Sequence, residues 1–202
     1  LGGRRIIKMK KAAIDYAIAQ GVIIVASAGN NGTAGMGYPG AYAPVISVAA
    51  SGWAGEWYPM PPNTGAWWYG LNVADPTNPD HMYITDFSSR ALAGQDLDVA
   101  APGSWVVGPY QLNSGSVASY YYLGGTSMAS PHVAGIVALM AQKYPALTAP
   151  EAETILESSA IYLAPGSRTI YGSSGAAEVV TWGADATGAG LATADAALAG
   201  IP

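Results

Sequence analysis

The chain has 202 residues, of which 50% are hydrophobic and only 10% are charged. This balance excludes an intrinsically disordered chain, which needs low hydrophobicity and high charge, and the length suffices for one domain with a hydrophobic core. The absence of cysteine excludes a disulfide framework, a thiolate metal site and a cysteine nucleophile. No apolar run reaches the roughly 18 residues needed to span a membrane.

Charge is distributed unevenly along the chain. The net charge of −5 argues against nucleic acid as the main partner. Most of the basic residues lie within the first eleven positions, at Arg4, Arg5, Lys8, Lys10 and Lys11, and we interpret them as the solvated face of one helix. The chain opens with Leu1-Gly2-Gly3, without an initiator Met or a signal peptide, and we interpret it as a fragment or a processed product.

The first predicted elements are a helix and a buried strand. Residues 6–19 predict an amphipathic helix, because Ile7, Ile14 and Ile18 recur at helical spacing, and Gly21 ends it. Residues 22–28 form a continuous run of mostly β-branched residues, which is typical of a strand buried on both faces of a parallel sheet. A helix followed by such a strand indicates α/β winding.

The rest of the chain continues this alternation. Further strands are predicted at 45–50, 98–101 and 119–123, and the segment 188–199 is predicted to end in a helix of small residues. Residues 126–143 are apolar nearly all round, which predicts a central, buried helix. Thr148-Ala-Pro-Glu151 is a capping box that opens a helix to about residue 158. No repeat or linker divides the chain, so we expect one domain over residues 1–202.

Residues 51–85 differ in composition from the rest. They hold four of the six Trp residues (Trp53, Trp57, Trp67 and Trp68) and no Lys or Arg. We predict a long ordered loop, whose aromatic side chains either pack on one another or form a platform for a substrate.

Residues 124–135 carry the strongest chemical signal. They place Ser127 where a glycine-rich turn becomes the first turn of a helix, and the unpaired N–H groups and dipole of a helix start favour negative charge. A serine nucleophile at this point can stabilise a developing oxyanion with its own N–H. The residues alone leave open that the turn is simply a helix cap.

A second signal follows the strand predicted at 22–28, where the sequence reads Gly29-Asn30-Asn31-Gly32. Sites in open α/β sheets form beyond the carboxyl ends of the strands. Asn30 can aim its carboxamide N–H into such a crevice, although Asn-Asn-Gly alone is typical of a turn. The two signals in this order are more specific than either one.

Together these motifs resemble the catalytic domain of subtilisin-like serine proteases, the subtilase family. The segment Gly125–Gly135 matches the family's serine signature, and Val25–Gly32 resembles the segment that supplies its oxyanion-hole asparagine. Similar loops occur at Tyr38–Tyr42, Phe87–Arg90, Leu97–Gly103 and Gly188–Leu191. The resemblance implies an α/β fold with an open, mostly parallel sheet and helices on both faces. It also implies that the N-terminal part of the domain is missing from this chain.

The resemblance implies a serine endopeptidase that hydrolyses peptide bonds through an acyl-enzyme on Ser127. The Asn30 side chain and the Ser127 N–H would form the oxyanion hole. Thr126 would orient this region, and Met128 would pack behind the serine. The pocket for the residue before the scissile bond would be walled by Ala26, Ser27, Ala28, Gly29 and Gly37. Gly2 and Gly3 would hydrogen-bond an extended substrate.

The Asp and His of the triad have no counterpart here. Family members order their triad Asp, His, Ser, so both motifs are expected upstream of Leu1, in the missing part of the same domain, and the chain alone is expected to be inactive. His132 lies five residues after Ser127, about 140° around an ideal helix, so it is a poor candidate for the base. His81 lies in the Trp-rich segment without a surrounding motif. An α/β-hydrolase is disfavoured, because the only His after Ser127 is His132.

The alternative function is a non-catalytic binding module, or pseudoenzyme, that uses the Trp-rich loop. The resemblance otherwise implies an extracellular protein with a polypeptide substrate, no nucleic-acid or membrane partner and no required cofactor. Structural calcium is a further expectation. The equivalent of the family's weak cation site would use carbonyls of Gly40, Tyr42 and Val45, and Asp75 with Asp80 is a second candidate.

Overall fold

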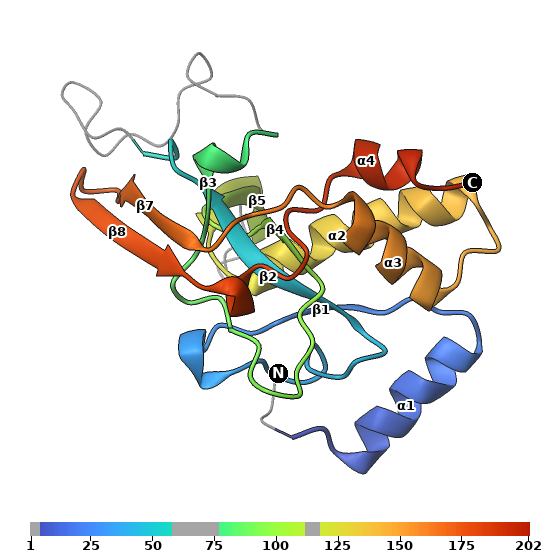
Figure 1. Cartoon of the computed structure of the whole chain (residues 1–202). Helices are drawn as coiled ribbons and strands as arrows, with labels where there is room; N and C mark the ends of the chain where they lie inside the picture. Colours follow the sequence, from blue (N-terminus) through green and yellow to red (C-terminus); the bar gives the residue numbers. More distant parts are fainter. Residues whose placement is uncertain (1–4, 58–76, 112–117) are drawn as a thin grey trace.

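The structure is a computed structural model that describes residues 5–57, 77–111 and 118–202. Its central element is strand β2 (Ile46–Trp53), which lies between β1 (Val25–Ser27) and β4 (Val99–Pro102), and both neighbours run parallel to it (Figure 1). Strand β3 (Met82–Ile84) pairs antiparallel with the end of β2. The carboxyl ends of β1 and β4 therefore flank β2, which is where sites form in open α/β sheets.

Four helices accompany this sheet in the described part of the chain. Helix α2 (Thr126–Lys143) crosses one face and packs against β1, β2 and β4. Helix α4 (Ala194–Ala199) packs against both α2 and α3 (Ala149–Ser159). Helix α1 (Lys8–Ala19) lies at the opposite end of the view from the hairpin of β7 (Gly166–Tyr171) and β8 (Ala177–Trp182) (Figure 1). The Tyr42 hydroxyl donates a 2.6 Å hydrogen bond to Asp15 of α1.

The core lies on both faces of β2, because alternate side chains of a strand point in opposite directions. Ile46, Val48 and Ala50 pack with Val99 and Ala101 of β4 against the buried face of α2. Ala49 and Ala100 point the other way, toward a second cluster that includes Ile84 and the C-terminal segment.

Two antiparallel hairpins lie outside the main sheet. Strand β5 (Val106–Gln111) pairs with β6 (Ala118–Leu123), which leads directly into the turn before α2. Strand β7 (Gly166–Tyr171) pairs with β8 (Ala177–Trp182), and β8 contacts β3. Short 3-10 turns occur at Gly32–Ala34, Pro79–His81 and Ala184–Ala186.

Several sequence predictions agree with these elements. The helix predicted at 6–19 is α1, which ends before Gly21 with φ +84°, and its Lys11 pairs with Asp15 at 2.7 Å. The capping box of α3 is confirmed, because Thr148 and Glu151 exchange both hydrogen bonds. The strands predicted at 45–50, 98–101 and 119–123 correspond to β2, β4 and β6.

Three predictions need correction. The strand predicted at 22–28 is shorter, and Val25–Ser27 are half-buried rather than buried on both faces, because β1 pairs only with β2 among the described strands. Helix α2 buries one face, and its other face exposes Ala134, Ala138 and Leu139, whose apolar side chains led to the prediction of a helix that is apolar all round. The segment 51–85 is not all loop, because Ser51–Trp53 belong to β2 and Met82–Ile84 form β3.

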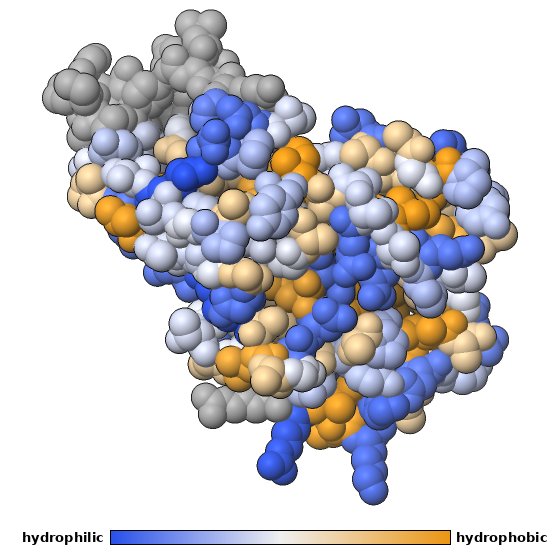
Figure 2. Space-filling view, in the orientation of Figure 1, coloured by the Kyte–Doolittle hydropathy of each residue, from blue (hydrophilic) through white to orange (hydrophobic). Residues whose placement is uncertain are grey.

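The surface is mixed in character. Figure 2 shows apolar residues in small patches separated by polar ones over the described part of this face. No helix within the described residues is long and apolar enough to cross a membrane.

Candidate active site

Ser127 lies in the first turn of α2 and is exposed to solvent. The turn before it is fixed to the end of β4, because the Gly125 N–H donates to the Gly103 carbonyl at 2.7 Å. Gly103 has no space for a side chain, since a Cβ there would lie 2.6 Å from the Ala50 Cβ. Within the described ranges no hydrogen bond engages Ser127 Oγ or its N–H. Both groups are therefore available at a helix start, where negative charge is favoured.

Asn30 follows β1 and reaches the same turn. Its Oδ1 accepts the Thr126 N–H at 2.9 Å and the Thr126 hydroxyl at 2.8 Å. Because a backbone N–H can only donate, the accepting atom must be the carboxamide oxygen, which leaves Nδ2 as a donor. A Cβ built on Gly125 would lie 3.5 Å from Asn30 Nδ2 and 3.7 Å from Ser127 N. The structure thus brings the two predicted donors within 4 Å of one point beside Gly125.

Thr126 connects the two motifs. Its side chain is 1% exposed, and Oγ1 both donates to Asn30 and accepts the Gly29 N–H at 3.2 Å. A buried hydroxyl that satisfies both roles holds the Asn30 loop against the start of α2. Met128 is half-buried, with its Sδ 3.5 Å from the position of a Cβ on Gly125.

The Phe87–Arg90 segment holds the Asn30 loop from the other side. The Gly32 N–H donates to the Phe87 carbonyl at 2.9 Å, and the Ser89 N–H donates to the Gly29 carbonyl at 2.8 Å. Gly29 has φ +109°, and a Cβ there would lie 3.0 Å from Ser89 Oγ, so this close approach requires glycine. Arg90 is 5% exposed and donates to the Thr85 and Ser88 carbonyls, which keeps the segment compact.

The predicted pocket walls have mixed exposure. Ala28 is buried, its carbonyl accepts the Gly37 N–H at 2.8 Å, and its N–H donates to the Val48 carbonyl, so Gly37 lies beside the end of β1. Ala26, Ser27 and Gly29 are half-buried. Gly2 and Gly3 lie outside the described residues.

Neither histidine is arranged as a base for Ser127. His132 is exposed, and its Nδ1 is 2.8 Å from the carbonyl of Met128, one turn earlier in the same helix. His81 belongs to the Pro79–His81 turn, where its carbonyl accepts the Ala54 N–H and its Nδ1 is buried without a hydrogen bond among the described residues.

An aromatic cluster stands beside the turn that carries Ser127. Trp57 is buried and meets Trp105 edge to face at 5.1 Å between ring centroids, and Tyr122 contacts both rings. Trp57 thus packs inward rather than forming a platform, and Trp53 is half-buried. Trp67 and Trp68 lie outside the described residues, so the prediction for the rest of the Trp-rich segment is unchanged.

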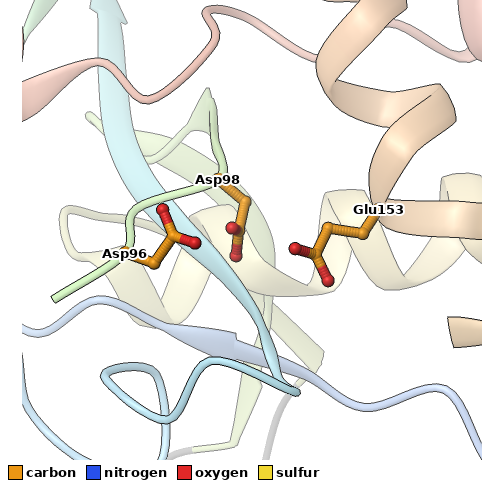
Figure 3. Close-up of side chains that lie close together, drawn as sticks. All are labelled: Asp96, Asp98 and Glu153. Atoms are coloured by element: carbon orange, nitrogen blue, oxygen red, sulfur yellow. The ribbon is translucent and has the colours of Figure 1, made fainter. Parts of the chain in front are cut away.

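Three carboxylates converge between the segment before β4 and helix α3, as Figure 3 shows. Asp96, Asp98 and Glu153 each offer one oxygen, and these oxygens lie within 4.8 Å of one another. Asp98 is 1% exposed; its Oδ2 accepts the Ser47 N–H at 2.6 Å and the Ser47 hydroxyl at 2.9 Å, whereas Oδ1 has no partner among the described residues. No sequence motif indicates this cluster, because Glu153 is distant in the chain from Asp96 and Asp98.

The cluster perturbs its own ionisation. Burial and then the negative charges of Asp98, Glu157 and Asp96 raise the pKa of Glu153 from its ordinary value of 4.5 to about 7. Burial raises the pKa of Asp98, although the hydrogen bonds from Ser47 oppose the shift. A hard cation such as Ca²⁺ prefers oxygen ligands of this kind.

Two of the cation ligands expected from the sequence, Asp80 and the Tyr42 carbonyl, already have other partners. The Asp80 carboxylate pairs with Arg168 at 3.3 Å, and its carbonyl accepts the Arg168 Nε–H, while Asp75 lies outside the described residues. The Tyr42 carbonyl accepts the Val45 N–H at 2.8 Å. The set of Gly40, Tyr42 and Val45 remains a prediction.

This fold and this convergence of serine, asparagine and threonine define a known class. Residues 3–190 match the model of the Subtilase family, Peptidase S8, so the chain belongs to the subtilase family. The family predicted from the sequence is thereby confirmed.

Curated relatives and solved structures agree with this assignment. The chain is 36% identical to Subtilisin DY of Bacillus licheniformis over 167 residues, which is 81% of this chain and 48% of the relative. It is 34% identical to Subtilisin E of Bacillus subtilis strain 168 over 176 residues, which is 85% of this chain and 36% of the relative. The chain therefore spans about half or less of the curated relatives it matches.

One similar solved structure is that of fervidolysin from Fervidobacterium pennivorans, a keratinolytic enzyme related to subtilisin. It aligns with a TM-score of 0.63 and 30% identity, covering 100% of this chain and 26% of that one. A protease from Pseudoalteromonas arctica PAMC 21717 aligns with a TM-score of 0.67 and 28% identity, covering 100% and 50%.

Proposed function

We propose that this chain is the serine-bearing part of a serine endopeptidase that cleaves peptide bonds through an acyl-enzyme on Ser127. The observation that carries the proposal is the carboxamide of Asn30, whose oxygen is held by Thr126 so that Nδ2 remains a donor beside the Ser127 N–H. A pair of donors aimed at one point stabilises the oxyanion that develops when Oγ attacks a carbonyl.

The general base acts from a segment outside these 202 residues. A serine hydroxyl needs a base within hydrogen-bond reach to become a nucleophile, and neither His81 nor His132 hydrogen-bonds Ser127 Oγ. Membership of the subtilase family, together with relatives of about twice this length, supports an upstream Asp and His as the missing triad members.

Substrate binding uses the end of β1. Ala26, Ser27, Ala28, Gly29 and Gly37 carry small side chains or none, which leaves room for a sizeable apolar side chain before the scissile bond. Gly2 and Gly3 would extend the contact by strand addition to the substrate backbone. The family supports an extracellular protein whose substrates are polypeptides.

Structural calcium belongs to the same proposal, at the cluster of Asp96, Asp98 and Glu153. The unpartnered buried oxygen of Asp98 and the all-oxygen donor set fit Ca²⁺. A bound calcium ion supplies positive charge that offsets the repulsion among the three carboxylates. It would join the segment before β4 to α3 without taking part in peptide hydrolysis.

The whole polypeptide that contains these residues tests the function. It should hydrolyse internally quenched peptides, and Ser127→Ala should abolish the hydrolysis. Ser130→Ala, a serine one turn further along α2, is the matched control and should retain activity. Hydrolysis that survives in Ser127→Ala would overturn the proposal.

A further inference from the structure

A cavity borders the turn that carries Ser127. It has a volume of about 260 Å³ and is formed where Thr85–Phe87, Ser104–Trp105 and Gly124 meet the β7–β8 hairpin. This volume is just below the range of about 300–1,000 Å³ that holds small ligands, so it suits one or two side chains of a peptide. Sequence analysis did not predict the hairpin, although Gly172-Ser-Ser-Gly175 between β-branched residues is a hairpin signal.

The cavity borders Gly124, whereas Asn30 faces Gly125, the next residue of the turn. A Cβ built on Gly125 would contact Asn30 Nδ2, whereas one built on Gly124 would lie 3.7 Å from the ring of Phe87, a cavity wall. The walls proposed for the residue before the scissile bond lie on the Asn30 side, at the end of β1. An extended peptide crosses the nucleophile from one side to the other, so this cavity receives a residue after the scissile bond.

The cavity wall is acidic. Asp86 and Glu178 line it, and none of the lining residues is Lys or Arg. A third carboxylate lies behind the wall, because Glu56 accepts hydrogen bonds from the hydroxyls of Tyr83 at 3.2 Å and Ser104 at 2.9 Å, and both of these residues line the cavity.

The cations of the adjoining segments are engaged elsewhere. Arg168 of β7 binds the carboxylate and carbonyl of Asp80 and lies over the Trp182 ring. Arg90 donates to two backbone carbonyls in the interior. The sequence of 58–76 and 112–117 contains no Lys or Arg, so these segments add no positive charge.

The remaining walls are apolar and include a fixed aromatic ring. Phe87, Ile170 and Val180 offer surface for an aliphatic stem. Trp105 has φ +47°, a conformation that non-glycine residues rarely adopt, and its ring is held edge to face by Trp57 and Tyr122. An aliphatic stem that ends in a cation is the side chain of Lys or Arg.

We infer that this cavity is a specificity subsite that binds a Lys or Arg side chain on the leaving-group side of the scissile bond, with Glu178 and Asp86 as the residues that select the charge. The inference rests on the proposed function for its substrate class. The apolar walls hold the stem, and the carboxylates hold the cationic end.

The test uses two peptides that correspond to the part of the substrate after the scissile bond. They differ at one residue, which is Lys in one peptide and norleucine in the other. Titration calorimetry with the whole protein carrying Ser127→Ala measures binding without cleavage. Because partly exposed ion pairs contribute modestly, the Lys peptide should bind about three- to tenfold more tightly. Glu178→Gln and Asp86→Asn should each reduce this ratio toward one, while Glu157→Gln, the same chemical change on α3, should leave it unchanged.

The same variants, with Ser127 intact, are then assayed for cleavage of full-length peptides that carry Lys or norleucine at this position. The value of kcat/KM should be higher for the Lys peptide, and Glu178→Gln should remove this preference. Equal binding of the two peptides, or a preference that survives both substitutions, overturns the inference whatever the cleavage shows. If calorimetry shows the Lys preference but no peptide is cleaved, the proposed endopeptidase function is overturned, whereas the inference about the subsite is supported.

Discussion

At the scale of single residues, the site depends on how one carboxamide is oriented. Motifs predicted Asn30 and Ser127 as partners, but no sequence pattern shows which way an asparagine side chain points. The structure supplies the reason, because both hydrogen bonds of Thr126 fix the oxygen of Asn30. The family resemblance named Thr126 as an orienting residue, whereas these bonds, across 96 positions of sequence, could only be found in three dimensions.

Asn30→Ala in the whole protein should lower kcat by about 100- to 1,000-fold with little change in KM, which is the loss known for removal of one oxyanion-hole donor in a subtilisin. Thr126→Val should lower kcat in the same direction but by less, because it removes one of the two hydrogen bonds that hold the Asn30 oxygen and keeps the backbone one. Steady-state kinetics on a peptide substrate measure both effects. An unchanged kcat in Asn30→Ala would remove this residue from the oxyanion hole.

Glu153 predicts a pH dependence of stability in calcium-free buffer. Its pKa is raised to about 7 in the folded state, so between about pH 4.5 and 7 the folded chain binds more protons than the unfolded chain. The stability contributed by the protonated group is therefore complete at low pH and lost as pH rises through about 7. Glu153→Gln should match the parent protein near pH 4 and be more stable near pH 8 in urea unfolding. A stability difference that does not vary with pH would contradict this.

At the scale of elements, sequence motifs predicted the structure correctly where a few adjacent residues determine it. The capping box of α3 and the glycine after α1 were predicted because each depends on a few adjacent residues. The exposure of one face of α2 was not predictable, because that face carries apolar residues such as Ala138 and Leu139. Strands β3, β5, β7 and β8 were not predicted, because each depends on antiparallel pairing with another segment, which local residue patterns do not show.

Removal of the Thr148 cap should destabilise α3 locally. Thr148→Ala loses the hydroxyl that accepts the Glu151 N–H and donates to its carboxylate, which should cost about 1 kcal/mol of the free energy of unfolding. Thermal or urea unfolding measures the cost, with Thr154→Ala on the exposed side of α3 as the control. Equal stability of the two variants would show that the box contributes nothing.

Calcium should join α3 to the segment before β4. Calcium chelation should lower the thermal midpoint of the protein and increase hydrogen exchange in α3, and added Ca²⁺ should restore both. Asp98→Asn should abolish the response to Ca²⁺, whereas Asp80→Asn should preserve it. A thermal midpoint that does not change with added Ca²⁺ at neutral pH would contradict a calcium site here.

At the scale of the whole molecule, the site is assembled from distant segments. Residues near positions 30, 87, 103 and 126 meet at the ends of β1, β2 and β4, and the order of the family motifs predicted that they would. The cavity at the β7–β8 hairpin and the carboxylate cluster were not predictable, because each joins segments with no shared motif. The chain spans about half or less of the curated relatives it matches, and the upstream base for Ser127 is part of the proposed function.

Residues 1–202 alone should therefore hydrolyse peptides negligibly, even when circular dichroism shows that the chain is folded. The whole polypeptide should be active under the same conditions. Robust turnover by the 202 residues that is lost in His81→Ala would contradict the assignment of the base to an upstream segment.

The most direct measurement of the central claim is the site of covalent modification by a fluorophosphonate in the whole protein, mapped by mass spectrometry of its peptides. The phosphonyl group should be found on Ser127, and its rate of attachment should fall in Asn30→Ala and stay unchanged in Ser130→Ala. Modification at another serine, or none on Ser127 in a protein that hydrolyses peptides, would contradict Ser127 as the nucleophile.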